Sequence, residues 1–135
     1  RYETRKISEM GGIRAQSPKF TSMFMLLVLA SVALPSTFNF VGEFTVLYSL
    51  SQVNIWFAIL GGTTIILGAY YMLKMFQHVM LGETNTKIFA DVTFNEGLTL
   101  VIIIAVLFFF GLYPKPIMTL ITPSLENILV QINRN

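Results

Sequence analysis

The stretch LTLVIIIAVLFFFGLY, residues 98–113, decides the fold class of this chain. No charged residue lies between Gly97 and Pro114. A helix needs about 20 apolar residues to cross the ~30 Å hydrocarbon core of a bilayer. β-branched side chains are frequent here, but a segment in lipid must bond its backbone groups internally, and a helix does so. The stretch therefore predicts a transmembrane helix over residues 97–114, which stops at Pro114-Lys115-Pro116.

The composition of the whole chain also indicates a membrane protein. Hydrophobic residues make up 54% and charged residues 12% of the 135 positions, whereas soluble chains carry about 25% charged residues. This apolar content excludes disorder, and the lack of cysteine excludes a disulfide-stabilised secreted domain. The net charge is only +2 and the twelve Phe lie in apolar runs, so no nucleic-acid partner is expected. The alternating pattern of outer-membrane barrel strands is absent, which leaves an all-α integral membrane protein in a lipid bilayer.

Two further apolar passages precede residues 98–113 in the sequence. Residues 20–52 are too long for one straight span and are interrupted by LPSTFN, residues 34–39, while residues 55–80 are uniformly apolar until Lys74. We therefore predict three transmembrane passages in one incomplete membrane domain, the first of them a discontinuous helix. Residues 115–135 form a C-terminal tail with a short amphipathic segment that Pro123 interrupts and Ser124 caps. That segment is too short and polar to span, so we expect it on the membrane surface or on neighbouring protein.

The basic residues predict the orientation of these passages. Residues 1–19 contain Arg1, Arg5, Lys6, Arg14 and Lys19, residues 81–96 contain Lys87, and the tail contains only Lys115 and Arg134. By the positive-inside rule, residues 1–19 and 81–96 are cytoplasmic loops, and the tail lies on the opposite side. The sequence begins without Met and shows no signal peptide, so we expect it to be a piece of a longer protein.

The interruption of the first passage is a candidate functional feature. Pro35 lacks a backbone donor and clashes with the preceding helical turn, so a helix there must kink or break. Ser36, Thr37 and Asn39 follow, and their side chains can satisfy freed backbone groups, with a second helix starting near Phe40. Broken helices at membrane depth line watery cavities or ion sites in transporters. A proline-kinked span without any site is the alternative.

Glu43 is the only acidic or basic residue between Lys19 and Lys74. An acid at the bilayer centre costs at least ~2.5 kcal/mol, so it persists where it is useful or paired. Removal from water favours the protonated form, whereas the positive end of the second half-helix and a lysine partner favour the ionised form. An acid balanced between these effects can bind and release a proton, so Glu43 is the predicted proton-translocation residue. The alternatives are a protonated acid that only bonds helices together, and an acid at the membrane interface.

Lys74 and His78 lie four residues apart and therefore share one helix face. They are candidates for a hydrated path to Glu43, although Lys74 is better explained as a side chain that reaches the cytoplasmic boundary. A lone histidine without cysteines or clustered carboxylates does not indicate a metal site. Gly61, Gly62 and Gly68 are expected to allow close helix packing.

Six motifs carry a resemblance to a known family. They are RKI (5–7), EMGG (9–12), ASVALPST (30–37), NFVGEF (39–44), LGAYYML (67–73) and GLYP (111–114). Together they resemble the C-terminal part of the NADH-quinone oxidoreductase chain M family, subunit 4 of respiratory complex I in mitochondria. Related antiporter-like chains often carry lysine at the position of Glu43, and the glutamate points to chain M. This sequence departs from the family in having Ser36 where glycine is usual and Asn39 where a small residue is usual.

The resemblance implies a fourteen-helix antiporter-like fold, of which this chain would be the last three membrane passages. Glu43 would be the proton-carrying acid of a broken twelfth helix, facing lysines on earlier segments of the same protein. The other membrane subunits of the complex would be partners, and the missing N-terminal part of the chain would complete the fold.

The implied function is that of a proton-translocating membrane subunit of NADH:quinone oxidoreductase, an enzyme whose redox chemistry occurs elsewhere. No flavin, iron–sulfur or quinone ligand and no metal is expected in this chain, because NADH, FMN, iron–sulfur clusters and quinone would belong to partner subunits. The alternatives are a subunit of a related cation/proton antiporter or membrane-bound hydrogenase, and a structural membrane anchor. The expected location is the bacterial inner membrane, with the mitochondrial inner membrane as the alternative.

Overall fold

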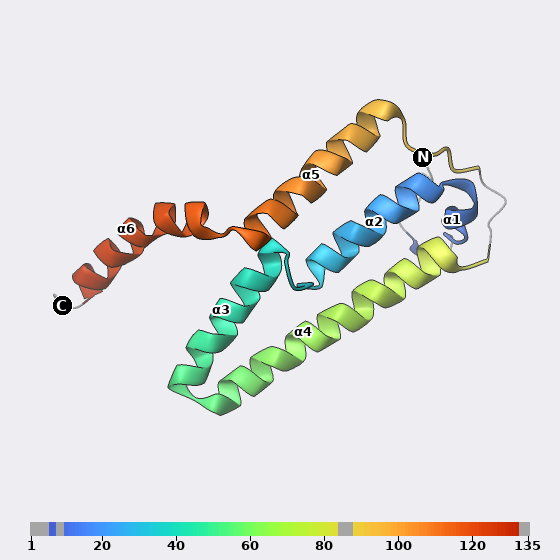
Figure 1. The fold of residues 1–135 in the computed structure, drawn as a ribbon. Helices are drawn as coiled ribbons and strands as arrows, with labels where there is room; N and C mark the ends of the chain where they lie inside the picture. Colours follow the sequence, from blue (N-terminus) through green and yellow to red (C-terminus); the bar gives the residue numbers. More distant parts are fainter. Residues whose placement is uncertain (1–5, 8–9, 84–87, 133–135) are drawn as a thin grey trace.

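The computed structural model describes residues 6–7, 10–83 and 88–132, and this part of the chain is helical without strands. Its elements are α1 (Ile13–Gln16), α2 (Pro18–Ser31), α3 (Phe38–Val53), α4 (Ile55–Phe76), the π-helix η2 (Gln77–Leu81), α5 (Phe94–Leu112) and α6 (Lys115–Ile132). α3 continues in the general direction of α2, α4 returns alongside both, α5 packs against α2 and the start of α3, and α6 leads away (Figure 1). The predicted all-α class is confirmed.

The helices begin and end a few residues from the predicted bounds. α2 begins at Pro18, which suits a first helical turn because proline has no N–H to leave unpaired. α5 begins at Phe94, after a capping box in which the Thr93 backbone N–H donates to Glu96 Oε2 at 2.8 Å. Parts of the two predicted loops, 1–19 and 81–96, are therefore helical. Arg1, Arg5, Lys87 and Arg134, on which the orientation partly depends, lie outside the described residues.

Among the described residues, two helices are long and apolar enough to cross a membrane. They cover Ile55–Leu81, with 27 residues, and Phe94–Leu112, with 19 residues. In the most apolar 18 residues of each helix, only 0% and 6% of the residues are buried within this chain. α2 and α3 have 14 and 16 residues, so at 1.5 Å per residue neither alone spans a ~30 Å hydrocarbon core.

The first half of the predicted interruption ends α2 by backbone hydrogen bonds. The Leu34 N–H donates to the Leu29 carbonyl at 3.1 Å, and the Ala33 N–H donates to the Ala30 carbonyl at 3.3 Å. Ala33 has a φ of 54°, the left-handed conformation that such a Schellman motif requires. Alanine pays a steric penalty there that glycine would not.

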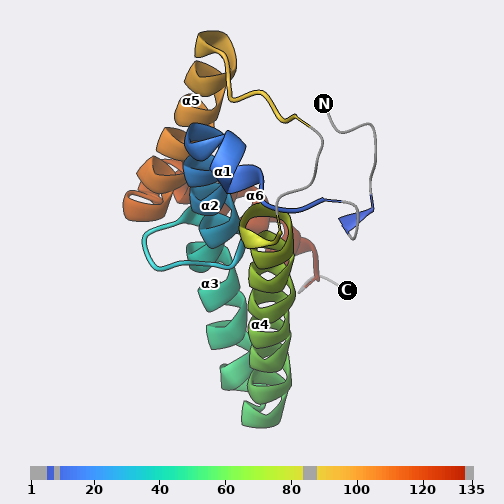
Figure 2. The ribbon, with the colours of Figure 1, turned by 90° about the vertical axis from the view of Figure 1, so that its right-hand side faces the viewer.

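The second half of the interruption is a β-turn, visible beside α2 and α3 in Figure 2. The Thr37 N–H donates to the Leu34 carbonyl at 3.0 Å and closes the turn. Pro35 takes the second position, and Ser36 takes the third with a φ of 85°. This is the pattern of a type II turn, which favours proline and then glycine at these two positions.

The interruption covers residues 32–37, so one detail of its prediction was wrong. Asn39 does not belong to the break, because α3 begins at Phe38 rather than near Phe40. No side chain caps the start of α3 by a hydrogen bond. The Thr37 hydroxyl donates instead to the Leu34 carbonyl at 2.7 Å, within the turn, so one side chain of the break does satisfy a freed backbone group, as predicted.

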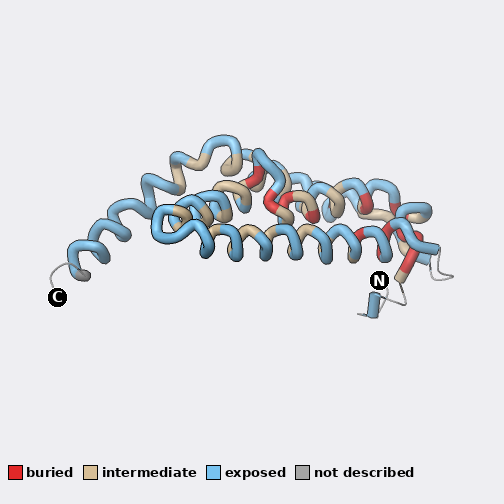
Figure 3. Tube along the Cα trace, turned by 90° about the horizontal axis from the view of Figure 1, so that it is seen from below, coloured by how far each residue is buried: buried red, intermediate tan, exposed pale blue. Residues whose placement is uncertain are grey.

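A packed core lies at the end of the molecule that contains α1 and η2, and Figure 3 shows buried segments there and also near the middle of the molecule. It joins α1, α2, the end of α4 and η2 through the buried side chains Ile13, Val28, Phe76, Val79 and Met80. The glycines of the two adjoining loops also meet here. A Cβ on Gly82 would lie 2.6 Å from the His78 carbonyl oxygen and 3.7 Å from Gly11 Cα, so no larger residue fits.

Asp91 ties the connection before α5 to the first turn of α2. Its carboxylate accepts the Phe20 N–H at 3.0 Å and the Lys19 N–H at 3.4 Å, and it also accepts the Val92 N–H at 2.8 Å. Desolvation raises the pKa of Asp91, but these backbone donors and the charge of Lys19 outweigh it and hold the pKa below its ordinary value. Ser17 is the N-cap residue of α2, but its side chain does not cap the helix. Its hydroxyl donates to the Phe89 carbonyl at 2.8 Å and so forms a second link to this connection.

α6 is one helix from Lys115 to Ile132, so the prediction that Pro123 interrupts it and Ser124 caps a new helix was wrong. Proline inside a helix removes one hydrogen bond and strains the preceding turn. The described side chains from Leu120 onward are exposed. The helix extends away from the bundle (Figure 3).

Candidate functional site

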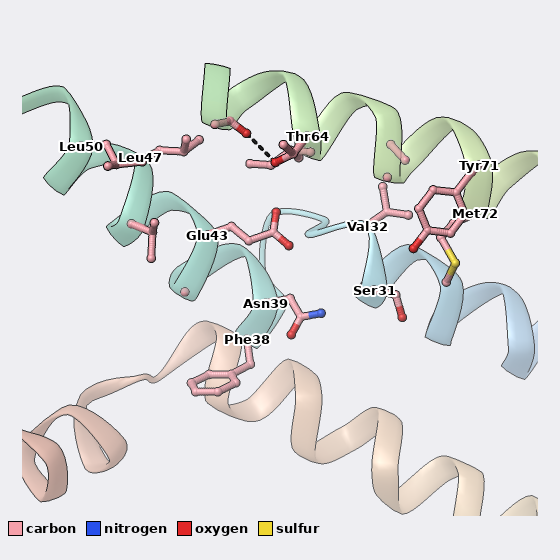
Figure 4. Close-up of a pocket in the computed structure, with 16 residues that line it drawn as sticks. Ser31, Val32, Phe38, Asn39, Glu43, Leu47, Leu50, Thr64, Tyr71 and Met72 are labelled. Atoms are coloured by element: carbon pink, nitrogen blue, oxygen red, sulfur yellow. Dashed lines mark hydrogen bonds between the residues drawn. The ribbon is translucent and has the colours of Figure 1, made fainter. Parts of the chain in front are cut away.

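A groove of about 660 Å³ lies between α3 and α4 and continues to the end of α2. Apolar side chains form most of its walls, including Leu47 and Leu50 of α3. The polar side chains that line it are Ser31, Asn39, Glu43, Thr64 and Tyr71. Figure 4 shows the Glu43 carboxylate in the space between the two helices, while the Tyr71 hydroxyl lies toward Ser31.

Glu43 is half-buried in this groove and lies in the second turn of α3. It has no hydrogen bond or ion pair within the part of the chain that the structure describes. The electrostatic effect of a helix terminus fades beyond the first turn, so the N-terminus of α3 does little to stabilise an ionised Glu43 carboxylate. An ionised Glu43 would therefore need water or a cationic side chain from outside these residues.

The break fixes where Glu43 stands. α3 can begin at Phe38 because the turn at residues 34–37 reorients the chain, and this start sets the face on which Glu43 emerges. Thr37 is fully buried, and the Phe38 ring meets the Phe110 ring edge-on at 6.3 Å. α5 thus holds the start of α3 in place.

Gly111 of α5 makes the closest approach to the break. A Cβ built on Gly111 would lie 2.5 Å from the Thr37 carbonyl carbon and 2.6 Å from Thr37 Cα, and it would also overlap the Ser36 carbonyl oxygen. Real Cβ atoms do not approach so closely, so backbone would have to move. Only glycine lets α5 pack directly on the turn that leads into α3.

Lys74 and His78 do not line the groove. Both side chains are exposed, and Lys74 Nζ donates to the Tyr70 hydroxyl at 3.1 Å. His78 lies in η2, where its Nδ1 pairs with the Lys74 carbonyl at 2.9 Å. Within the described residues the structure therefore brings Lys74 and His78 together but does not bring them to Glu43.

The groove also contains residues that sequence reasoning missed, above all Thr64 and Tyr71. They lie with Gly61 and Gly68 at spacings of three and four along α4, so all four residues share one helix face. That stripe of small and polar residues in an apolar helix was the available signal. Of the three glycines predicted to allow close packing, Gly61 does so here, because a Cβ would lie 3.0 Å from Leu47 Cδ2.

The described residues hold no group of three or more His, Cys, Asp or Glu that could bind a metal ion. The single carboxylate in the groove, flanked by hydroxyl and amide side chains, can accept a proton or pair with one cation. The arrangement therefore has the chemistry of an ion or proton site.

Residues 1–68 match a family model described as the transmembrane domain of the NADH:quinone oxidoreductase/Mrp antiporter family. The chain belongs to this family, and its apolar helices are those of a membrane protein.

Curated relatives narrow the comparison within that family. The chain is similar to "NADH-quinone oxidoreductase subunit M" of Rickettsia typhi, with 40% identity over 97% of this chain and 27% of the relative. The proteins of the same name from Rhodobacter capsulatus and Mycobacterium tuberculosis are each 34% identical, over 96% and 100% of this chain. The chain spans about a quarter of the length of these relatives.

Proposed function

We propose that this chain forms the last membrane passages of a proton-translocating subunit of NADH:quinone oxidoreductase. Glu43 is the proton-carrying acid in this proposal. α2 and α3 together form one broken passage, and the helix Ile55–Leu81 and α5 form the other two. The family match and the name shared by the relatives support the assignment to the complex.

One observation carries the role of Glu43. Its carboxylate, the only charged group between Lys19 and Lys74, faces a groove beside a helix break rather than the outer surface of α3. A membrane-embedded acid of this kind is costly unless it serves an ion pathway. Ser31, Asn39, Thr64 and Tyr71 supply the polar lining through which water and protons can reach it.

The rest of the complex completes the proposal. The groove is open, so the remaining part of the subunit, about three quarters of the length of its relatives, covers it and supplies a cationic partner for Glu43. Other subunits carry NADH, FMN, the iron–sulfur clusters and quinone. In this arrangement residues 1–19 and the connection before α5 face the cytoplasm, and the membrane is the bacterial inner membrane.

The test replaces Glu43 by Gln in the full-length subunit within the assembled complex. Gln keeps the size and polarity but cannot lose a proton. We expect NADH-driven proton pumping into membrane vesicles to fall at least tenfold, while NADH oxidation by an artificial acceptor continues. Glu126→Gln, an exposed glutamate on α6, is the matched control and should leave pumping unchanged. Normal pumping by Glu43→Gln would overturn the proposal and favour a structural membrane anchor.

A second candidate, a cation/proton antiporter or membrane-bound hydrogenase subunit, is favoured by the Mrp antiporter part of the matching family. The same vesicles separate the two candidates. Sodium-dependent transport without NADH-quinone activity in the native membrane would select the antiporter. Transport that depends on NADH oxidation and not on sodium would exclude it.

A further inference from the structure

A second, smaller groove lies between the first turns of α2 and α5, away from Glu43. Its volume is about 380 Å³, and its apolar walls include Met23 of α2 and Leu98 and Val101 of α5. Gly97 of α5 is buried at the floor, where a Cβ would lie 3.7 Å from Met23 Cε, an ordinary van der Waals distance. The groove is thus a slot between α2 and α5 with a buried glycine at its floor.

The mouth of the slot is charged. Lys19, the second residue of α2, lines this end, and its side chain has no hydrogen bond within the described residues. The neighbouring carboxylates already have partners, because Asp91 accepts backbone N–H groups of α2 and Glu96 accepts the Thr93 N–H and hydroxyl. The charge of Asp91 attracts the Lys19 ammonium, but no hydrogen bond joins the two side chains, so the N–H groups of the ammonium are still available to the oxygens of an anion.

The slot runs from polar to apolar sequence. It opens beside Phe94, where the candidate span Phe94–Leu112 begins, and Val101 lies seven residues, or about 10 Å, further along the helix axis. A positive charge at the membrane boundary above an apolar channel matches one kind of molecule, a phospholipid with its phosphate at the surface and its chain in the core.

We propose that this slot binds a phospholipid, with the phosphate diester at Lys19 and an acyl chain along Met23, Leu98 and Val101. A covering protein helix fits less well, because it would bury the Lys19 ammonium, and the oxygens of the neighbouring acid Asp91 already accept backbone N–H groups. A lipid leaves that ammonium at the headgroup level while its chain fills the slot.

The test uses the full-length subunit in its complex, reconstituted in phosphatidylethanolamine vesicles that contain a trace of the same lipid with a photoreactive acyl chain. Mass spectrometry should find labels at Met23 and Val101. Lys19→Gln should lower this labelling about fivefold, which corresponds to about 1 kcal/mol for one lysine at a membrane surface. Leu98→Trp should abolish it by filling the slot.

Matched controls lie at the other end of α5. Lys115→Gln and Leu112→Trp, both at exposed positions, should leave the labelling unchanged. Competition by millimolar inorganic phosphate would indicate a phosphate site and overturn the lipid assignment. Labelling that is absent, or unchanged in both Lys19→Gln and Leu98→Trp in an assembled complex, would also overturn it. A cross-link from Leu98→Cys to another protein segment would show that a helix occupies the slot.

Discussion

The two ends of this molecule are built in different ways. The end that contains α1, the start of α2 and η2 has a buried core and polar tethers such as Ser17 and Asp91. The end that contains α3 and the first half of α4 has no buried residue in α3 and leaves a groove around Glu43. The contrast supports the proposal that other membrane segments cover the groove at the second end.

The largest expected effect is in the packed end. Met80 is 2% exposed and receives the Thr21 hydroxyl at its sulfur, so Met80→Ala should cost about 2–5 kcal/mol of unfolding free energy. Leu60→Ala, at a 63% exposed position of α4, should cost less than about 1 kcal/mol if lipid faces it. Thermal unfolding of the full-length subunit in detergent compares the two. A loss for Met80→Ala no larger than that for Leu60→Ala would contradict a packed core at the first end.

The next effect tests the contact that joins α5 to the break. Gly111→Ala forces a Cβ into the backbone of Ser36 and Thr37, and we expect a loss of about 1–3 kcal/mol together with reduced pumping. Gly62→Ala is the control, because a Cβ there meets nothing within 4 Å. It should be neutral or stabilising, since alanine favours helices. Equal tolerance of both substitutions would contradict the close packing of α5 on the break.

The hydrogen bonds of Asp91 at the packed end can be tested through the pH dependence of stability. Its folded-state pKa is lowered, so its stabilising contribution is present above the ordinary pKa of 3.8 and is lost as the pH falls through the folded-state value. Asp91→Asn keeps an oxygen acceptor but does not titrate. We expect the difference in melting temperature between the wild type and this variant to shrink as the pH falls below 4. A difference in melting temperature that stays constant with pH would show that the hydrogen bonds to the ionised Asp91 carboxylate do not stabilise the fold.

The smallest effect concerns the backbone of the break itself. Ser36, with φ 85°, takes the turn position that favours glycine, so Ser36→Gly should stabilise the subunit by about 0.5–1 kcal/mol. Ser49→Gly, in the exposed middle of α3, should destabilise it by about the same amount. Chemical denaturation of both variants measures the pair. A loss of stability in Ser36→Gly would contradict the turn.

The sequence predicted the features that local chemistry controls. Pro35 indicated the break because proline cannot continue a helix, and the uncharged run at residues 98–113 indicated a helix long enough to span. Asn39 was misplaced because a residue that suits a cap also tolerates a first turn, and the left-handed φ of Ala33 and Ser36 decided where α3 begins. Pro123 was misread because an exposed helix can tolerate one missing hydrogen bond.

The groove could be predicted only in part. Glu43 was found because a lone charge in an apolar run is costly, whereas Thr64 and Tyr71 are unremarkable until α3 packs against their face of α4. Lys74 and His78 have the spacing of one helix face, but spacing does not say which neighbour that face meets, and neither residue lines the groove. Asp91 lies 71 residues from Phe20, and no local pattern predicts a bond over that separation.

The central proposal is that Glu43 changes its protonation state during turnover, and infrared difference spectroscopy of the intact complex measures this most directly. We expect a carboxyl band to appear or disappear when NADH is added in the presence of quinone. That band should be missing from Glu43→Gln and present in Glu126→Gln. A difference spectrum of Glu43→Gln that keeps every carboxyl band of the wild type would contradict the proposal.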